Sequence, residues 1–409
     1  MLADSKLFAP PVTREIAARI IAALKTGKPP HEYVGTIHVG YKPLLDYFRE
    51  KLDEIRDLGV SDVKFVNADF GRGKSHFLDL IRLLAFERGF VVSRVELNQR
   101  DVPFDKLEIV IQHIITNVAT ADFRNNGFEK LLRKWAHEQR GKSSNDLYAE
   151  LENLPMPQLR ANLVEFVQAA NADPPAPRRI TELLRWFRGE ETPSKTFRSV
   201  QEYLHALTQF FRQIGYSGFV IMLDEAEAIS SLTRGNRGSI ANENIRQIID
   251  NDQDSQGFYF VFASTPTFFE APAGGQVRRG DPITVYSYPA LRRRVENVLS
   301  LMDPYSPDSV IVELPDLSES DYLELAKKIR DFTVLAYGES PAPVSDGDLA
   351  ILVRYVRSND PRVATLVRSV ASVCERARRP GFAFRQTYEM VVEHERERVN
   401  RKASEEARG

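Results

Sequence analysis

The chain has 409 residues, of which 43% are hydrophobic and 27% charged, enough apolar content for two or three folded domains and too much for a chain disordered throughout. Its 55 basic and 57 acidic residues leave a net charge of −2, which excludes binding of nucleic acid through the charge of the whole surface. The single cysteine, Cys374, excludes a disulfide framework and a zinc site built of thiolates.

The N-terminal segment and the hydropathy pattern indicate where the protein works. The first residues include acidic and polar side chains without a continuous apolar run, so no secretory signal is predicted. No apolar run approaches the ~18 residues that a membrane span needs. We therefore expect a cytoplasmic protein that makes no contact with a membrane.

The first predicted elements alternate between helix and strand. Apolar residues at helical spacing predict a helix over residues 13–25 and an amphipathic helix over about 42–57. A short β-rich run at 63–68, a helix over 74–88 and a strand at 90–97 follow. Strand, helix and strand at this spacing indicate a parallel βαβ unit.

A sequence typical of a phosphate-binding loop joins the first strand to its helix. Residues 68–75, ADFGRGKS, match the relaxed Walker A pattern, with Ala68 in place of the first glycine. Small residues are needed because backbone N–H groups must curl round the phosphates, and a Cβ at Gly71 or Gly73 would obstruct them. The positive end of the following helix would face the anion. The alternative is an ordinary glycine-containing turn between a strand and a helix.

The loop predicts ATP and Mg²⁺ as ligands. Lys74 is expected to reach the β- and γ-phosphates, where it would act in catalysis, and Ser75 to ligate the metal. The expected nucleotide contacts of this segment are Asp69, Phe70, Gly71, Arg72, Gly73, Lys74, Ser75 and His76.

A helical stretch separates the βαβ unit from two further strands. From about 105 to 210 the pattern is helical, with proline-rich breaks at 155–157 and 174–177, and it is too long for one crossover connection. We therefore interpret it as a helical insertion. Apolar runs at 218–223 and 257–264 then predict strands, the first typical of a central strand covered on both faces.

Both of these strands end in polar residues. Asp224 and Glu225 follow the first; in a P-loop enzyme Asp224 would hold the Mg²⁺ shell and Glu225 would be the general base for the attacking water. The alternative is an acidic pair that caps a helix after the strand. The second strand ends at Ser264 and Thr265, either of which could hydrogen-bond the γ-phosphate or the water; an ordinary strand end is the alternative.

The C-terminal part is predicted to be helical. Ser318 with Asp321, and Ser345 with Asp348, fit capping boxes that begin helices. No strand is predicted in this part.

The chain therefore divides into three predicted parts. Residues 1–60 form an N-terminal helical segment, and 61–316 form an α/β nucleotide-binding core that contains the insertion. Residues 317–409 form a helical lid and a C-terminal helix.

These motifs together resemble those of AAA+ ATPases, which implies a P-loop core with a parallel sheet and a helical lid. The segment Asn359-Asp360-Pro361-Arg362 resembles the sensor-2 motif of the origin-recognition clade, where an arginine in the first turn of a lid helix contacts the γ-phosphate. Asp360 can cap a helix and Pro361 is favoured at its first position, which agrees with such a turn at Arg362. A surface arginine at a helix start is the alternative.

Longer segments are similar to the ATP-binding proteins of the BREX phage-defence system, BrxD and its P-loop relatives. The resemblance covers most of the chain and is strongest in 13–118 and 218–270. By the AAA+ layout it implies that Val39 and Gly40 lie beside the adenine. It further implies an ATP-dependent homo-oligomer and partners from the same defence system, with a helicase or a methyltransferase suspected.

The chain departs from the initiator relatives in two ways. Only about 30 residues follow Arg379, too few for their DNA-binding winged helix. No arginine finger is identifiable, although several arginines lie in the part of the core where oligomeric AAA+ proteins place one: Arg278, Arg279, Arg292, Arg293 and Arg294. With Arg234 and Arg237, these residues are also a candidate DNA-binding or subunit-contact edge, and a solvated surface is the alternative.

Three functions follow from the sequence. The first is a Mg²⁺-dependent AAA+ ATPase of a prokaryotic phage-defence or DNA-transaction system. The second is an ATP-gated switch or loader that docks partner proteins and hydrolyses ATP slowly. The third is a DNA-binding protein that uses the arginine-rich edge.

Overall fold

The computed structural model describes most of the chain, which forms two compact units. The described residues are 10–190, 197–232, 236–250, 256–269, 285, 288–295 and 309–406. The first unit comprises Met1–Phe48, Asn67–Leu84 and Glu313–Gly409, and the second comprises Arg49–Val66 and Ala85–Val312. The two ends of the chain therefore belong to one unit. The domain boundaries expected from the sequence stay a prediction.

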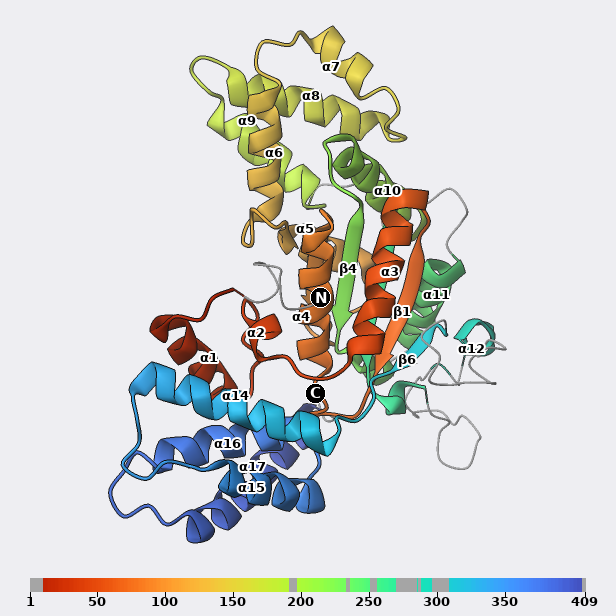
Figure 1. The fold of residues 1–409 in the computed structure, drawn as a ribbon. Coiled ribbons are helices and arrows are strands. Elements are labelled where there is room, and N and C mark those ends of the chain that lie inside the picture. Colours follow the sequence, from red (N-terminus) through yellow and green to blue (C-terminus); the bar gives the residue numbers. More distant parts are fainter. Residues whose placement is uncertain are drawn as a thin grey trace. The chain divides into compact units, whose positions relative to one another are not determined.

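A six-stranded sheet organises the second unit (Figure 1). Its order is β3-β2-β4-β5-β1-β6, and the strands are β1 (Asp62–Asn67), β2 (Val91–Glu96), β3 (Val118–Ala119), β4 (Phe219–Asp224), β5 (Phe258–Ser264) and β6 (Ile311–Glu313). β4 pairs in parallel with β2 on one side and with β5 on the other, whereas β3 is antiparallel to β2. The expected α/β class with a mostly parallel sheet is confirmed.

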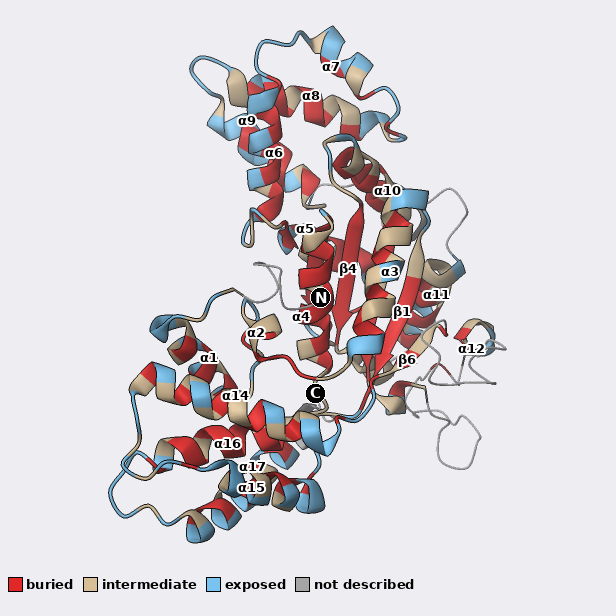
Figure 2. Cartoon of the chain, viewed as in Figure 1, coloured by how far each residue is buried: buried red, intermediate tan, exposed pale blue. Residues whose placement is uncertain are grey.

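The central strand β4 is buried along its whole length, as its apolar sequence predicts (Figure 2). A strand of this kind needs cover on both faces of the sheet. The strands predicted at 63–68, 90–97, 218–223 and 257–264 each agree with an observed strand to within one residue at each end. The apolar runs were therefore sufficient to locate the main strands.

The predicted helical insertion also contains one short strand that the sequence did not predict. β3 pairs Val118 with Ser93 and Ala119 with Val92. Two residues are too few to produce a periodic signal in the sequence. They form a strand because the edge of β2 offers backbone groups to pair with.

Helices make up the rest of the insertion. They are α5 (Leu107–Thr116), α6 (Gly127–Glu138), α7 (Ser144–Glu150), α8 (Pro157–Asn171), α9 (Pro177–Phe187) and α10 (Phe197–Gln213). Pro157 and Pro177 begin α8 and α9, where proline costs no hydrogen bond. Trp135 is buried and packs edge-on against Phe210 with ring centroids 5.0 Å apart. The second unit also contains η1 (Ala226–Ser231), α11 (Arg237–Asp250), η2 (Pro266–Phe268) and α12 (Pro289–Val295).

The first unit is largely helical. Its helices are α1 (Arg14–Thr26), α2 (Val34–Ile37), α14 (Glu319–Tyr337), α15 (Asp346–Asn359), α16 (Val363–Arg376) and α17 (Phe384–Glu406), together with most of α4 (Lys74–Glu87) and the start of α3 (Lys42–Leu58). Both predicted capping boxes are present, at Ser318 and at Ser345. They begin α14 and α15, whose apolar faces pack in one core with α1, α16 and α17.

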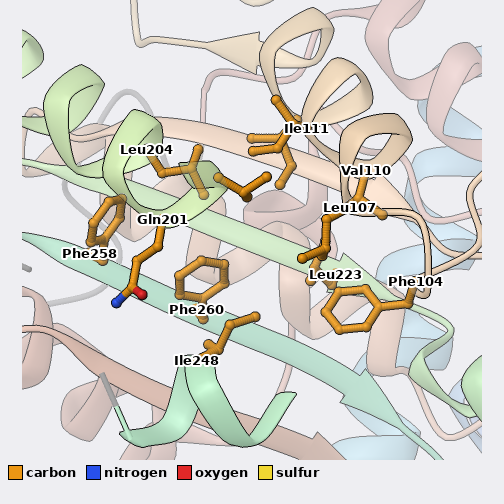
Figure 3. A pocket seen from close by; sticks show the side chains of 12 residues that line it. Phe104, Leu107, Val110, Ile111, Gln201, Leu204, Leu223, Ile248, Phe258 and Phe260 are labelled. Atoms are coloured by element: carbon orange, nitrogen blue, oxygen red, sulfur yellow. The ribbon is translucent and has the colours of Figure 1, made fainter. Parts of the chain in front are cut away.

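A small apolar pocket lies in the second unit (Figure 3). Side chains from α5, α10, α11, β4 and β5 line it, and its volume is about 40 Å³. Ligand pockets are typically about 300–1,000 Å³, so this pocket is a packing gap and no candidate for a nucleotide.

No helix in the described part of the chain is both long and apolar enough to cross a bilayer.

Candidate functional site

The loop that follows β1 has a backbone that favours glycine at two positions. Gly71 has a φ of +79° and Gly73 a φ of +100°, values that side chains rarely tolerate. A Cβ at Gly73 would meet no described atom within 4 Å, whereas one at Gly71 would come within 3.3 Å of Arg362 Cδ. The loop is therefore open beside Gly73 and closely covered at Gly71.

The start of α4 places positive charge at this loop. Lys74, the first residue of α4, is only 7% exposed, and its Nζ donates to the carbonyl oxygen of Ala68 at 2.9 Å. Ser75 and Phe70 are half-buried and Asp69 is exposed. A lysine ammonium together with the N–H groups of a helix start suits a phosphate, and a serine hydroxyl is an oxygen ligand of the kind that Mg²⁺ accepts.

Hydrogen bonds join the same loop to the C-terminal part of the chain, and all of these residues belong to the first unit. The backbone N–H of Ala364 donates to the carbonyl oxygen of Gly71 at 3.1 Å. Arg72 Nη1 lies 2.6 Å from Asp316 Oδ1 and donates to the carbonyl oxygen of Pro361 at 3.3 Å. The start of α16 therefore contacts the predicted phosphate loop directly.

Arg362 lies one residue outside the helical turn that the sequence predicts for it. It is the N-cap of α16, with extended backbone, and Asp360 is the C-cap of α15 instead of capping α16. The carboxylate of Asp360 accepts hydrogen bonds from Arg362 Nε and Nη2, both at 2.7 Å, and from the Thr365 hydroxyl at 2.6 Å. Asp360 therefore binds the arginine side chain, and the helix begins at Val363.

The segment expected beside the adenine packs against the loop helix. Val39 is buried, and Gly40 has a φ of +72°. The ring of His38 stacks with that of Tyr41 and with that of His76, with centroid distances of 5.9 Å and 5.7 Å. His76 belongs to the first turn of α4, so the structure brings these residues of the predicted site together with the loop.

Both stacked histidines are uncharged at neutral pH. Burial, and after it the neighbouring His76, lowers the pKa of His38 from the ordinary 6.5 to about 3. Burial also lowers the pKa of His76 to about 4, against the opposing effect of Asp79. A group whose folded-state pKa is depressed stabilises the fold above its unfolded pKa and loses that contribution as the pH falls towards the folded value.

Mild acid is therefore expected to destabilise the first unit. Between pH 7 and pH 5, His38 alone should cost about 2 kcal/mol of unfolding free energy, because the unfolded histidine takes up a proton and the folded one does not. Thermal unfolding of the wild type and of His38→Phe at both pH values measures this effect. A variant that loses as much stability as the wild type would contradict the assignment to His38.

The acidic strand end is held by an arginine on the neighbouring strand. Asp224, the last residue of β4, is 4% exposed, and its Oδ2 lies 2.6 Å from Arg94 Nη2 on β2. A buried carboxylate needs a counter-ion or strong hydrogen bonds, and the guanidinium supplies both. Glu96 is the register partner of Asp224 on β2 and is exposed. A charged residue within the apolar run of β2 is the sequence signal that could have identified Arg94.

Glu225 occupies an unusual backbone position directly after β4. Its φ of 59° and ψ of 43° lie in the left-handed region, and its N–H donates to Asp224 Oδ1 at 3.1 Å. Such a conformation costs a non-glycine residue roughly 1–2 kcal/mol, and strain of this kind clusters at functional sites. Its side chain does not cap η1, so the helix-capping alternative has no support here.

The two hydroxyls at the end of β5 differ in their surroundings. Ser264 is fully buried, and its Oγ has no hydrogen-bond partner among the described residues. Thr265 is half-buried, and its hydroxyl lies 2.8 Å from that of Thr267. β5 is the parallel neighbour of β4, so these residues follow the strand beside the acidic end.

Ion pairs take up part of the arginine-rich edge. Arg234, Arg278 and Arg279 lie outside the described residues. Arg237 makes two hydrogen bonds to Asp105, at 2.7 Å and 2.9 Å. Arg294 makes two to Asp250, at 2.5 Å and 3.0 Å. Paired arginines retain less net charge to attract a phosphate backbone.

A comparison with protein families identifies the family of this chain. Residues 12–368 match the family of BREX system ATP-binding proteins BrxC/D. The chain belongs to this family. No curated protein matches the chain. Membership in the BrxC/D family supports a defence-related ATP-binding role and partnership with other BREX proteins.

The BrxC/D match covers both groups of predicted site residues. The loop and its contacts with the C-terminal helices belong to the first unit, and the ends of β4 and β5 belong to the second. Helix α17 lies beyond the matched residues. Sequence reasoning missed Arg94, Asp316 and Asn400, which contact predicted site residues, because each of them is distant in the sequence from the residue it contacts.

Proposed function

We propose that this BREX protein is a Mg²⁺-dependent AAA+ ATPase that couples ATP hydrolysis to conformational change. The observation that carries the proposal is the loop after β1: two glycines with positive φ, open space at Gly73, and the Lys74 ammonium at the start of α4. The reactants are ATP and water, the cofactor is Mg²⁺, and the products are ADP and phosphate.

In this proposal the phosphate loop binds the triphosphate. The N–H groups of residues 69–76 and the ammonium of Lys74 neutralise its charge, and Lys74 must exchange its bond to Ala68 for the phosphate oxygens. Val39 and Gly40 lie on the segment that would hold the adenine. Binding and charge neutralisation account for most of the catalysis of phosphoryl transfer.

The chemistry of two side chains fits the metal. The Ser75 hydroxyl and the Asp224 carboxylate are oxygen ligands, and Mg²⁺ bound there would neutralise charge on the phosphates. Asp224 must share its carboxylate with Arg94, which already balances its charge. A metal ion bound by Asp224 would therefore approach a carboxylate that already has a basic partner.

Glu225 is the proposed general base and Arg362 the lid residue that contacts the terminal phosphate. The Glu225 carboxylate would take one proton from the attacking water, whose oxygen bonds to the γ-phosphorus as the bond to ADP breaks. Ser264 or Thr265 would orient that water or the γ-phosphate. Ser264 is favoured for this role because its buried hydroxyl has no hydrogen-bond partner among the described residues. Thr265 is favoured because it is more exposed.

The partners proposed are other BREX proteins, with a helicase or a methyltransferase suspected, and further copies of this chain in an ATP-dependent oligomer. Direct contact with DNA through the arginine-rich edge is a weaker candidate, because Arg237 and Arg294 are paired with carboxylates.

Phosphate release from ATP tests the proposal. The wild type should hydrolyse ATP with Mg²⁺ and not with EDTA, and Asp224→Asn should lower turnover by a factor on the order of 100. Glu96→Gln is the matched control, since it neutralises the register partner at the end of β2 and should leave turnover unchanged. Turnover that is independent of Mg²⁺, or equal losses in both variants, would contradict the metal site. Absent turnover with a nucleotide-dependent change in size or partner binding would favour the docking switch.

A further inference from the structure

The guanidinium of the lid arginine is bound by Asp360, which follows α15, and by Asn400 of α17. Asp360 accepts two parallel hydrogen bonds from Arg362 Nε and Nη2, each of 2.7 Å. Asn400 of α17 accepts a third from Nη2, with its Oδ1 at 2.6 Å. A guanidinium that donates two parallel hydrogen bonds to one carboxylate has a well-defined orientation. The amide oxygen of Asn400 restrains Nη2 of the same guanidinium further.

The carboxylate of Asp360, which binds this guanidinium, is itself held in place by burial and a further hydrogen bond. Asp360 is 5% exposed and also accepts a hydrogen bond from the Thr365 hydroxyl. Burial raises the pKa of Asp360, but the hydrogen bonds from Arg362 and Thr365 outweigh this and hold it below its usual value. The carboxylate is therefore charged at neutral pH and retains Arg362.

The aliphatic part of the same arginine faces the phosphate loop. A Cβ at Gly71 would come within 3.3 Å of Arg362 Cδ, and the neighbouring Ala364 N–H donates to the carbonyl oxygen of Gly71. Arg362 thus contacts the loop with its stem while its charged end is bound to Asp360 and Asn400. To reach a phosphate, the guanidinium must leave at least one of these two partners.

We propose that Asn400 is a positioning residue through which the C-terminal helix α17 restrains Arg362, so that triphosphate binding and the attachment of α17 oppose each other. The inference rests on the proposed contact between Arg362 and the terminal phosphate. Triphosphate binding draws Arg362 away from Asn400 and loosens this part of α17, and by reciprocity a firmly attached α17 weakens triphosphate binding. A diphosphate lacks the terminal group and is not affected.

Opposite substitutions at one exposed position test the restraint. Asn400→Leu removes the acceptor and should tighten binding of a non-hydrolysable ATP analogue by about five-fold, the net contribution of a typical hydrogen bond. Asn400→Asp supplies a charged acceptor and should weaken it by a similar factor. Neither variant should change the affinity for ADP, and both effects should vanish in an Arg362→Ala background. Met390→Ala, 62% exposed on the same helix, is the matched control.

Hydrogen exchange on the unmodified chain gives a second readout. The analogue should speed exchange of amides around Asn400, and ADP should not. Equal shifts for ADP and the analogue, or no shift in either Asn400 variant, would overturn the inference. If the analogue binds in a manner that depends on Lys74 but not on Asn400, only this inference fails. If the wild type binds no nucleotide, the proposed function fails with it.

Discussion

Glu225→Gln is expected to bind ATP as tightly as the wild type and to hydrolyse it 10²–10⁴-fold more slowly, the usual contribution of a general base. Glutamine keeps the size of the side chain but cannot accept the proton of the attacking water. The backbone should tolerate the change, because the backbone N–H of Glu225 donates to Asp224 Oδ1 and this bond does not depend on the Glu225 side chain.

The control for this variant is Glu227→Gln, which neutralises a half-buried glutamate two residues further along η1. Its turnover should stay within about two-fold of the wild type, as for a substitution away from the reacting atoms. Steady-state phosphate release and equilibrium binding of labelled ATP measure the two quantities separately. Normal turnover in Glu225→Gln would remove this residue from the mechanism.

Lys74→Ala is expected to abolish measurable ATP binding, a loss on the order of 100-fold or more in affinity. The side chain is almost fully buried at the loop, and its ammonium donates a hydrogen bond to the carbonyl oxygen of Ala68 in the loop. Its removal leaves the triphosphate without its main charged partner. Lys28→Ala, an exposed lysine of the same unit, should bind ATP normally.

The loss of binding must be separated from a loss of folding. Lys74→Ala also removes the donor to the Ala68 carbonyl, which costs about 1–3 kcal/mol if that oxygen stays buried. Lys74→Met retains the aliphatic stem and should bind ATP as poorly while unfolding closer to the wild-type temperature. Tight ATP binding by a folded Lys74→Met protein would exclude the phosphate loop as the binding site.

Local patterns in the sequence predicted most of the fold. The apolar run of β4 and the capping boxes at Ser318 and Ser345 depend on neighbouring residues, so spacing alone located them. β3 was missed because two residues carry no periodicity, and it exists only through pairing with β2. The start of α16 was two residues off because Asp360 binds Arg362 instead of capping that helix.

In the candidate site, too, local motifs could be predicted from the sequence and contacts between distant residues could not. The phosphate loop and the acidic end of β4 are contiguous motifs, and their residues follow the strands that the sequence predicts. The ion pair of Arg94 with Asp224 joins residues 130 positions apart, and the bond of Arg362 to Asn400 spans 38 positions. Such contacts depend on strand register and helix packing, which one sequence does not specify.

A single-turnover experiment tests the central claim most directly. Protein in excess over ATP labelled at the γ-phosphate is mixed with Mg²⁺, and the bound nucleotide is recovered and identified. We predict ADP and released phosphate from the wild type, unhydrolysed ATP retained by Glu225→Gln, and no retained nucleotide with Lys74→Ala. Hydrolysis at the wild-type rate by either variant would contradict the account.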